Sequence, residues 1–319
     1  CKILRFASIK KKLNTVTGAI DIENMGITLT HEHIMSNFGL DINEVGSYDE
    51  DAAFKQIIPY LKNLKTKGVR TIFDCTTTFF GRRVDLLKKI SEVSGIQIVT
   101  NTGYYGAAND KYIPEFAYSE SIEQISQRWI SEFENGIEGT TIKPGFIKLA
   151  FDSGTPSEID KKLFEAGVLT HKKTGLTLAV HTAENIEAIE TQLNILKKHN
   201  VNFDAVIWVH ANKIDNISYL LEKASQGLWI SLDGVNNSNT KQYIAILKSF
   251  KVKNLLNKVL LSHDGNSFPR GREIRPYGAI SNQLIPEMKS NSFSDKDIHQ
   301  LLVENPKKAF SIEIKTYIK

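Results

Sequence analysis

The chain has little cysteine and no long apolar run. Of its 319 residues only Cys1 and Cys75 are cysteines, too few and too far apart for a disulfide framework, and Cys75 lies in an apolar stretch typical of a buried thiol. No segment approaches the roughly 18 apolar residues of a membrane helix. Residues 1–12 are basic but lack the apolar core of a signal peptide. We therefore expect a cytoplasmic protein with no membrane partner.

The chain also lacks a block of charge of one sign. Its 40 Lys and Arg residues are interleaved with 36 Asp and Glu residues, for a net charge of +4. This pattern argues against a nucleic-acid partner. The hydrophobic fraction of 41% is ordinary for a globular protein, and no linker or repeat divides the sequence. Because α/β barrels of this length form one unit, we predict a single domain over 1–319.

Short apolar segments alternate with amphipathic ones along most of the chain. A hairpin is predicted at 14–24, followed by strands at 26–30, 69–75, 96–100, 144–150, 176–181, 205–210, 228–232 and 259–262. Helices are predicted at 51–67, 83–94, 121–135, 157–174, 184–199, 214–225 and 241–250, with two more at 277–289 and 294–304. The strands are apolar on both faces, as buried parallel strands are.

This pattern predicts an α/β fold, a (β/α)8 TIM barrel with a short N-terminal β-hairpin and extra C-terminal helices. A doubly wound open sheet is the alternative. It is disfavoured because no Gly-x-Gly-x-x-Gly follows a strand.

His31-Glu32-His33 ends the first predicted strand. The two histidines leave the same face of that strand, which makes half of a metal site. Taken alone, the motif fits a pair of core histidines equally well. The ends of other predicted strands supply the remaining ligand types, namely Lys148, His181, His210 and Asp264. Imidazole and carboxylate ligands suit Zn, Mn, Co or Ni.

The other histidines are expected to lie away from this cluster. His263 should point away from Asp264, its neighbour in the sequence. We expect His171, His199 and His299 to be surface residues of helices.

Together the motifs resemble the phosphotriesterase family of the amidohydrolase superfamily over nearly the whole chain. The matching segments are 14–18, 26–33, 146–150, 180–183, 209–210 and 261–264. The resemblance implies two divalent metal ions, with Zn expected first and Mn, Co or Ni as alternatives. It implies that His31, His33 and Asp264 hold the buried ion, that His181 and His210 hold the exposed ion, and that Lys148 becomes carboxylated and bridges both together with a hydroxide.

Two of these implied roles have plainer alternatives. Lys148 lies in an apolar run where an unpaired ammonium would be costly. Taken alone it still fits a lysine that reaches out to solvent, and carboxylation is favoured because the other five ligand positions are present. Asp264 is placed to carry the proton of the attacking hydroxide to the leaving oxygen. A role for Asp264 as a ligand alone fits the sequence equally well.

The substrate has to be inferred from the loops. Tyr105 matches a tyrosine near the metals of lactonase members of the family, although Tyr104 and a simple aromatic anchor remain alternatives. The loop at 231–239 lacks the arginine that acyl-homoserine lactonases tend to carry. The loop after Asp264 holds Arg270, Arg272, Arg275 and Tyr277.

Three guanidinium groups near the expected metals favour a small anionic substrate. The chain looks like the branch that opens phosphorylated sugar lactones of the pentono-1,4-lactone 5-phosphate type. The alternatives are a solvated arginine loop, and a phosphotriesterase or general lactonase with promiscuous organophosphate hydrolysis.

Two further classes are disfavoured. A non-catalytic binding protein would be expected to have lost a ligand position, and all six are present. Amidases and deaminases of the wider superfamily usually lack the bridging lysine or use one metal. The resemblance also allows a homodimer.

Overall fold

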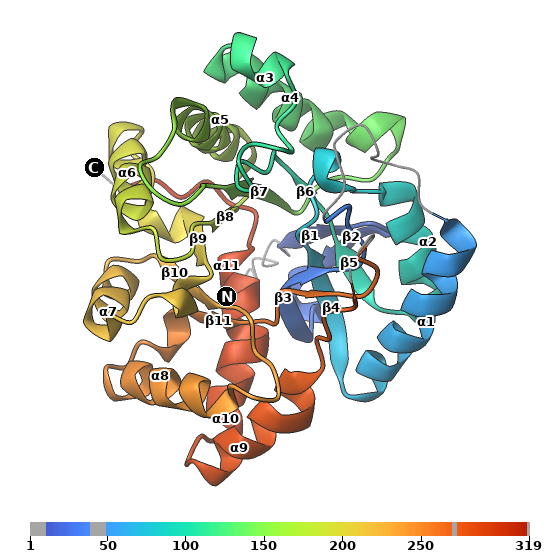
Figure 1. The fold of residues 1–319 in the computed structure, drawn as a ribbon, viewed down its shortest axis with the longest axis vertical. Helices are drawn as coiled ribbons and strands as arrows, with labels where there is room; N and C mark the ends of the chain where they lie inside the picture. Colours follow the sequence, from blue (N-terminus) through green and yellow to red (C-terminus); the bar gives the residue numbers. More distant parts are fainter. Residues whose placement is uncertain (1–10, 39–48, 270–272, 318–319) are drawn as a thin grey trace, which may run out of the picture.

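The computed structural model describes residues 11–38, 49–269 and 273–317, and shows a ring of parallel strands surrounded by helices (Figure 1). The strands pair in the orders β11-β10-β9-β8-β7-β6 and β12-β3-β4-β5. The chain passes directly from β5 (Gln97–Val99) to β6 (Asn101–Thr102), and from β11 (Val259–Leu261) to β12 (Gly265–Asn266). The two sheets are thereby joined at both edges, which confirms the predicted barrel.

The remaining barrel strands are β3 (Ile27–His33), β4 (Val69–Asp74), β7 (Phe146–Ala150), β8 (Leu178–His181), β9 (Val206–Val209) and β10 (Trp229–Leu232). They pair in parallel, with Lys148 opposite Ala179 and His181 opposite Val209. Because all strands run the same way, their carboxyl ends meet at one end of the barrel.

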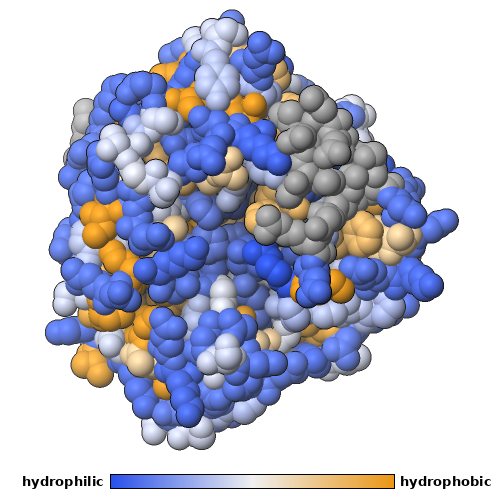
Figure 2. Space-filling model, in the orientation of Figure 1, coloured by the Kyte–Doolittle hydropathy of each residue, from blue (hydrophilic) through white to orange (hydrophobic). Residues whose placement is uncertain are grey.

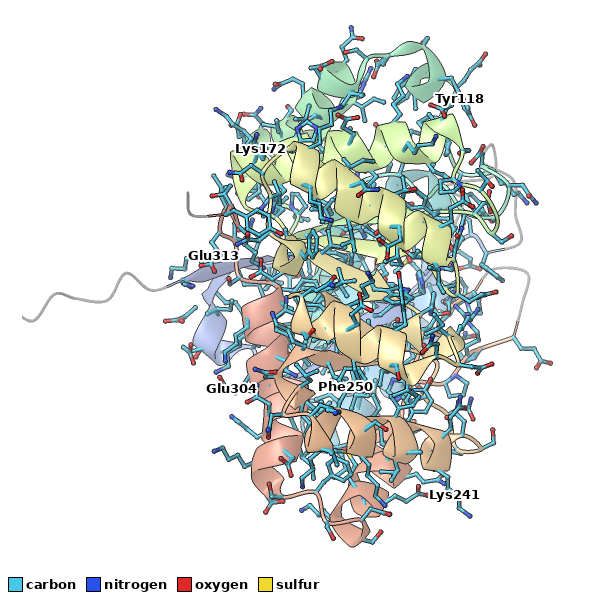
Figure 3. The ribbon with its side chains drawn as sticks, turned by 90° about the vertical axis from the view of Figure 1, so that its left-hand side faces the viewer. Tyr118, Lys172, Lys241, Phe250, Glu304 and Glu313 are labelled. Atoms are coloured by element: carbon cyan, nitrogen blue, oxygen red, sulfur yellow. The ribbon has the colours of Figure 1, made fainter. Side chains whose placement is uncertain are left out.

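Helices cover the outside of the ring. They are α1 (Glu50–Thr66), α2 (Val84–Ser94), α3 (Phe116–Ser119), α4 (Ile122–Asn135), α5 (Glu158–Thr174), α6 (Ile186–Lys198), α7 (Ile217–Ser225) and α8 (Thr240–Val252). The C-terminal helices are α9 (Ile285–Ser290), α10 (Asp295–His299) and α11 (Asn305–Ala309). Figure 3 shows α5 to α8 stacked along one side. No helix in the described ranges is both long and apolar enough to cross a membrane.

The helix ends follow local rules. The Ser157 hydroxyl accepts a hydrogen bond from the Asp160 N–H at the start of α5, and Gly175 ends that helix with a left-handed φ of 79°. The C-terminal helices differ from the prediction because π-helical turns at Ile280–Leu284 and Gln300–Glu304 precede Pro286 and Pro306. A proline cannot donate the regular helical hydrogen bond, and the wider turn accommodates its ring.

The predicted hairpin forms from β1 (Lys12–Thr15) and β2 (Gly18–Asp21), and it closes the amino-terminal end of the barrel. Leu13 packs in one buried cluster with Phe73, Phe146 and Phe310. Figure 3 places Glu313 beside this hairpin, and its carboxylate pairs with Lys11. Since side chains fill this end, the opening lies at the carboxyl ends of the strands.

Asp160, in the first turn of α5, makes the stability of the fold depend on pH. It is buried, and its Oδ1 makes no hydrogen bond. Burial raises its pKa from 3.8 to about 7, with the charges of Asp110 and Asp152 adding to the shift. Because the pKa is raised in the folded state, the protonated form stabilises the fold. This contribution is complete below pH 4 and is lost as the pH rises through 7.

We therefore expect the Tm of Asp160→Asn to exceed that of the wild type by a margin that grows as the pH rises from 4 to 7. Above pH 7 the difference in Tm should stay constant. Thermal unfolding of both proteins across this range is the measurement. A difference that does not vary with pH would contradict the assignment.

Candidate metal centre

The strand ends bring the predicted ligands to one cavity of about 710 Å³, at the hollow near the centre of the face in Figure 2. Five of the six line it, namely His31, His33, His181, His210 and Asp264. The ring centres of His31 and His210 are 5.0 Å apart, and those of His181 and His210 are 4.6 Å apart. Residues far apart in the sequence thus form one cluster of nitrogen and oxygen donors.

The carboxylate of Asp264 lies beside the imidazoles of both histidines of β3. Its Oδ1 lies 3.4 Å from Nε2 of His31 and 3.3 Å from Nε2 of His33. One ligand atom from each of His31, His210 and Asp264 lies within 4.8 Å of the others. This spacing and this donor set fit a divalent metal ion.

Side chains behind the cluster face the Nδ1 atoms of three histidines. Nδ1 of His33 lies 2.8 Å from the Thr76 hydroxyl. Nδ1 of His31 and Nδ1 of His210 lie 3.4 and 3.7 Å from Oδ2 of Asp233. Because Nδ1 faces these partners, Nε2 is left for a metal, as in known metal sites.

The imidazoles are also in the right protonation state for ligands. Burial lowers the pKa of His33 and of His210 to about 4, and it lowers that of His181 well below its usual value. They are therefore neutral at pH 7, as metal-binding imidazoles are.

Thr76 and Asp233 do not figure among the residues predicted from the sequence. Asp233 follows β10 directly, so an acid at the end of an apolar strand was a usable signal. For Thr76, nothing in the sequence separates it from other threonines.

Lys148 lies beneath the cluster and is fully buried. Its Nζ makes a long hydrogen bond of 3.4 Å to the Leu149 carbonyl and lies 5.7 Å from the centre of the Tyr105 ring. Burial lowers the pKa of this amine. A weakly bonded amine of lowered pKa suits a group that loses its positive charge, so Lys148 fits a carboxylated bridge between two ions.

The structure distinguishes the two adjacent tyrosines. Tyr105 lines the cavity, its hydroxyl is 3.3 Å from Nδ1 of His181, and its ring stacks on Phe80 at 5.1 Å. Tyr104 instead packs against Trp129, with ring centres 5.2 Å apart. Of the pair, only Tyr105 contacts the ligand cluster.

The residues predicted to bind substrate lie in different places. Arg275 lines the cavity, with Nη1 3.0 Å from Oδ2 of Asp264. Tyr277 is fully buried against Tyr60 and does not line the cavity. Arg270 and Arg272 lie outside the described residues.

The remaining histidines partly correct the sequence analysis. His263 turns away from Asp264 as expected, and its Nδ1 lies 2.6 Å from Glu32. His171 was expected at the surface, but it is fully buried, with Nδ1 2.9 Å from the Leu176 carbonyl. It lies on the inner face of α5. The many charged residues of this stretch of sequence led to the prediction of a surface position. His299 is exposed, as predicted.

A sequence profile of the phosphotriesterase family matches residues 11–310. The chain belongs to this family. The phosphotriesterase homology protein of Escherichia coli K12 is 29% identical over 89% of the chain and 98% of that protein. The aryldialkylphosphatase of Saccharolobus solfataricus is 28% identical over 92% of the chain and 97% of that protein. The N-acetyltaurine hydrolase of Xenopus tropicalis is 24% identical over 94% of the chain and 98% of that protein.

A solved structure agrees with the fold of this phosphotriesterase-family chain. It comes from the engineering of organophosphate hydrolysis from a weak promiscuous lactonase, and it superposes with a TM-score of 0.83 at 23% identity, over 94% of the chain and 99% of that structure. Family membership and the His/Asp cluster together make the protein a metal-dependent hydrolase.

Proposed function

We propose that this protein hydrolyses a small anionic lactone, of the phosphorylated pentono-1,4-lactone type. The observation that carries the proposal is Arg275, a guanidinium at the cavity wall directly beside Asp264. A phosphate or carboxylate pairs with such a group through two hydrogen bonds, whereas a neutral substrate gains little from it.

We assign the proposed metal positions to the residues of this cluster. His31, His33 and Asp264 would hold one divalent ion, His181 and His210 the other, and Lys148 would bridge both after its amine adds CO2 and releases a proton. When bound, such ions would lower the pKa of water and polarise the lactone carbonyl, whose carbon is attacked. Zn is our first choice among Zn, Mn, Co and Ni.

Asp264 is suited to move the proton. Burial opposes its ionisation, but the neighbouring His33, His31 and His210 hold its pKa well below the usual range. As a carboxylate it can accept the proton of the attacking water and deliver it to the ring oxygen. The bond between the lactone carbonyl carbon and the ring oxygen breaks, and a hydroxy acid results.

Exposed charge elsewhere on the wall is of both signs. Lys213 lines the cavity and is exposed, three residues after His210. Asp152 and Glu184 line the same cavity, so the proposal of an anionic substrate rests on Arg275 beside Asp264 and not on the net charge of the wall.

A phosphotriesterase or general lactonase with promiscuous organophosphate hydrolysis is the second candidate. The Saccharolobus aryldialkylphosphatase and the structure from a lactonase template support it. The aromatic wall of the cavity, formed by Phe38, Phe80 and Tyr105, would suit an apolar ester.

The cytoplasmic location and the homodimer remain predictions from the sequence.

The deciding experiment compares initial rates on matched lactones with and without a 5-phosphate, using metal-loaded protein. Paraoxon serves as a neutral phosphotriester and N-acetyltaurine as an anionic amide. We expect a kcat/KM preference of about 100-fold or more for the phosphorylated lactone, about 2.7 kcal/mol. Equal rates on both lactones would favour a general lactonase in place of this proposal. Faster hydrolysis of paraoxon would favour a phosphotriesterase, and faster hydrolysis of N-acetyltaurine would favour an amidase.

Tyr105→Phe tests the hydroxyl beside His181. Removing one hydrogen-bonding group at the ligand cluster should lower kcat by roughly 10-fold, because outer groups orient the ligands. Steady-state kinetics on the preferred lactone measure this effect. Tyr104→Phe is the matched control and should retain the wild-type kcat. An unchanged kcat in Tyr105→Phe would show that Tyr105 serves only as an aromatic anchor, because phenylalanine keeps the ring that stacks on Phe80.

A further inference from the structure

Glu32 stands between the two histidines of β3 but points away from the cavity. It is fully buried and does not line the cavity wall. Since neighbouring residues of a strand point to opposite sides, His31 and His33 face the cavity while Glu32 faces the last strand of the barrel. The mechanism described above leaves this buried acid without a role.

The carboxylate of Glu32 holds the chain on both sides of Asp264. Its Oε1 accepts hydrogen bonds from the backbone N–H and the Nδ1–H of His263, at 3.1 and 2.6 Å, and from the Ser262 hydroxyl at 2.7 Å. Its Oε2 accepts from the Gly265 N–H at 2.7 Å. With four donors the acid is fully satisfied in its ionised form.

His263 extends these contacts to the C-terminal helices. Its Nε2 accepts a hydrogen bond from the Ile280 N–H at 3.0 Å. This contact fixes the tautomer, because Nε2 must then be unprotonated while Nδ1 carries the proton given to Glu32. The imidazole is thus held on both sides.

Asp264 needs such support because of its backbone. It adopts a left-handed conformation with a φ of 51°, which is uncommon for a residue other than glycine. In this conformation its N–H donates to the His31 carbonyl at 3.1 Å, and its side chain turns to the two histidines of β3. Such a backbone persists where its neighbours hold it in place.

We propose that Glu32 and His263 form a clamp that positions Asp264 for metal binding and proton transfer. The clamp acts through Asp264 and touches neither substrate nor metal, so both members are positioning residues. The proposal rests on the role given to Asp264 under the proposed function.

Glu32→Gln is the primary test, because it keeps the size of the side chain but puts an NH2 group against N–H donors. With paraoxon and the phosphorylated lactone as probes, kcat should fall roughly 10- to 100-fold while KM changes little. The visible spectrum of the Co²⁺-loaded protein should also change, because the geometry at Asp264 changes.

Two further variants separate positioning from general stability. Asn305→Ala removes a buried amide that donates to the Leu256 and Val259 carbonyls, at the other end of the same strand region. It should lower Tm but leave kcat and the Co²⁺ spectrum unchanged. His263→Asn keeps a donor near the position of Nδ1 and should retain more activity than His263→Ala.

The outcomes are distinguishable. If Glu32→Gln lowers kcat no more than Asn305→Ala does, with an unchanged Co²⁺ spectrum, the clamp is overturned and Glu32 is only structural. If the wild type hydrolyses none of the probes, the proposed function fails, and the Co²⁺ spectra alone still decide on the clamp.

Discussion

Lys148→Met is expected to lower kcat by about 1,000-fold or more, about 4 kcal/mol of lost transition-state stabilisation. Lys148 is the ligand position that would serve both metal positions at once, so its loss affects both. Methionine fills a similar volume in the fully buried site, and it needs no charge partner there. We therefore expect the fold to persist, with the Tm of the metal-free variant level with or above that of the metal-free wild type.

Three measurements check this prediction. Metal analysis should show fewer than two ions per chain in the variant. The intact mass of the metal-loaded wild type under native conditions should exceed the sequence mass by one CO2 in addition to the bound metal ions, and the variant should lack the CO2. Reconstitution of the wild type with metal should be faster with bicarbonate than without it.

Lys315→Met is the matched control. Lys315 is also a buried lysine, its pKa is lowered by burial to about 8, and its Nζ donates to the Asp204 carbonyl at 3.0 Å. It lies on the C-terminal segment outside the cavity, so this variant should keep its kcat and its metal content. Full activity in Lys148→Met would exclude the bridging role.

Arg275→Ala is expected to raise KM for the phosphorylated lactone by about 100-fold while sparing the unphosphorylated analogue. The guanidinium already pairs with Asp264, so it stands where a substrate anion would meet the reaction centre. Its side chain is 42% exposed, which leaves donors free to turn toward a ligand. A bidentate pair with phosphate accounts for an effect of this size.

Arg275→Lys and Arg128→Ala complete the series. Lysine keeps the charge but loses the planar pair of donors, so its KM should fall between those of the wild type and Arg275→Ala. Arg128 pairs with Glu120 on the outer surface, and Arg128→Ala should change the KM for neither lactone. Equal losses on both lactones in Arg275→Ala would mean that the arginine serves Asp264 and not the substrate.

Much of the barrel and of the ligand cluster follows from local patterns. Each strand is short and apolar, and each ligand stands at or near its end. The parallel order of a barrel then gathers His31, Lys148, His181, His210 and Asp264 at one end without any knowledge of side-chain contacts. Helix ends such as Ser157 and Gly175 follow in the same way, because capping depends on neighbours in the sequence.

Other features depended on contacts between distant residues. Tyr104 and Tyr105 are equivalent by composition, and only packing against Trp129 or His181 separates them. Tyr277 stands in the arginine loop, yet it is buried against Tyr60, 217 positions away.

The same holds for the acids behind the ligands. Glu32 meets His263 across 231 positions, and Asp233 meets the N–H of His210 across 23. The sequence by itself determined the barrel, the order of the strand ends and the types of ligand, because these depend on local periodicity and on strand direction. Only the tertiary structure decided which side chains support those ligands and which line the cavity, because these depend on packing between segments that the sequence does not place side by side.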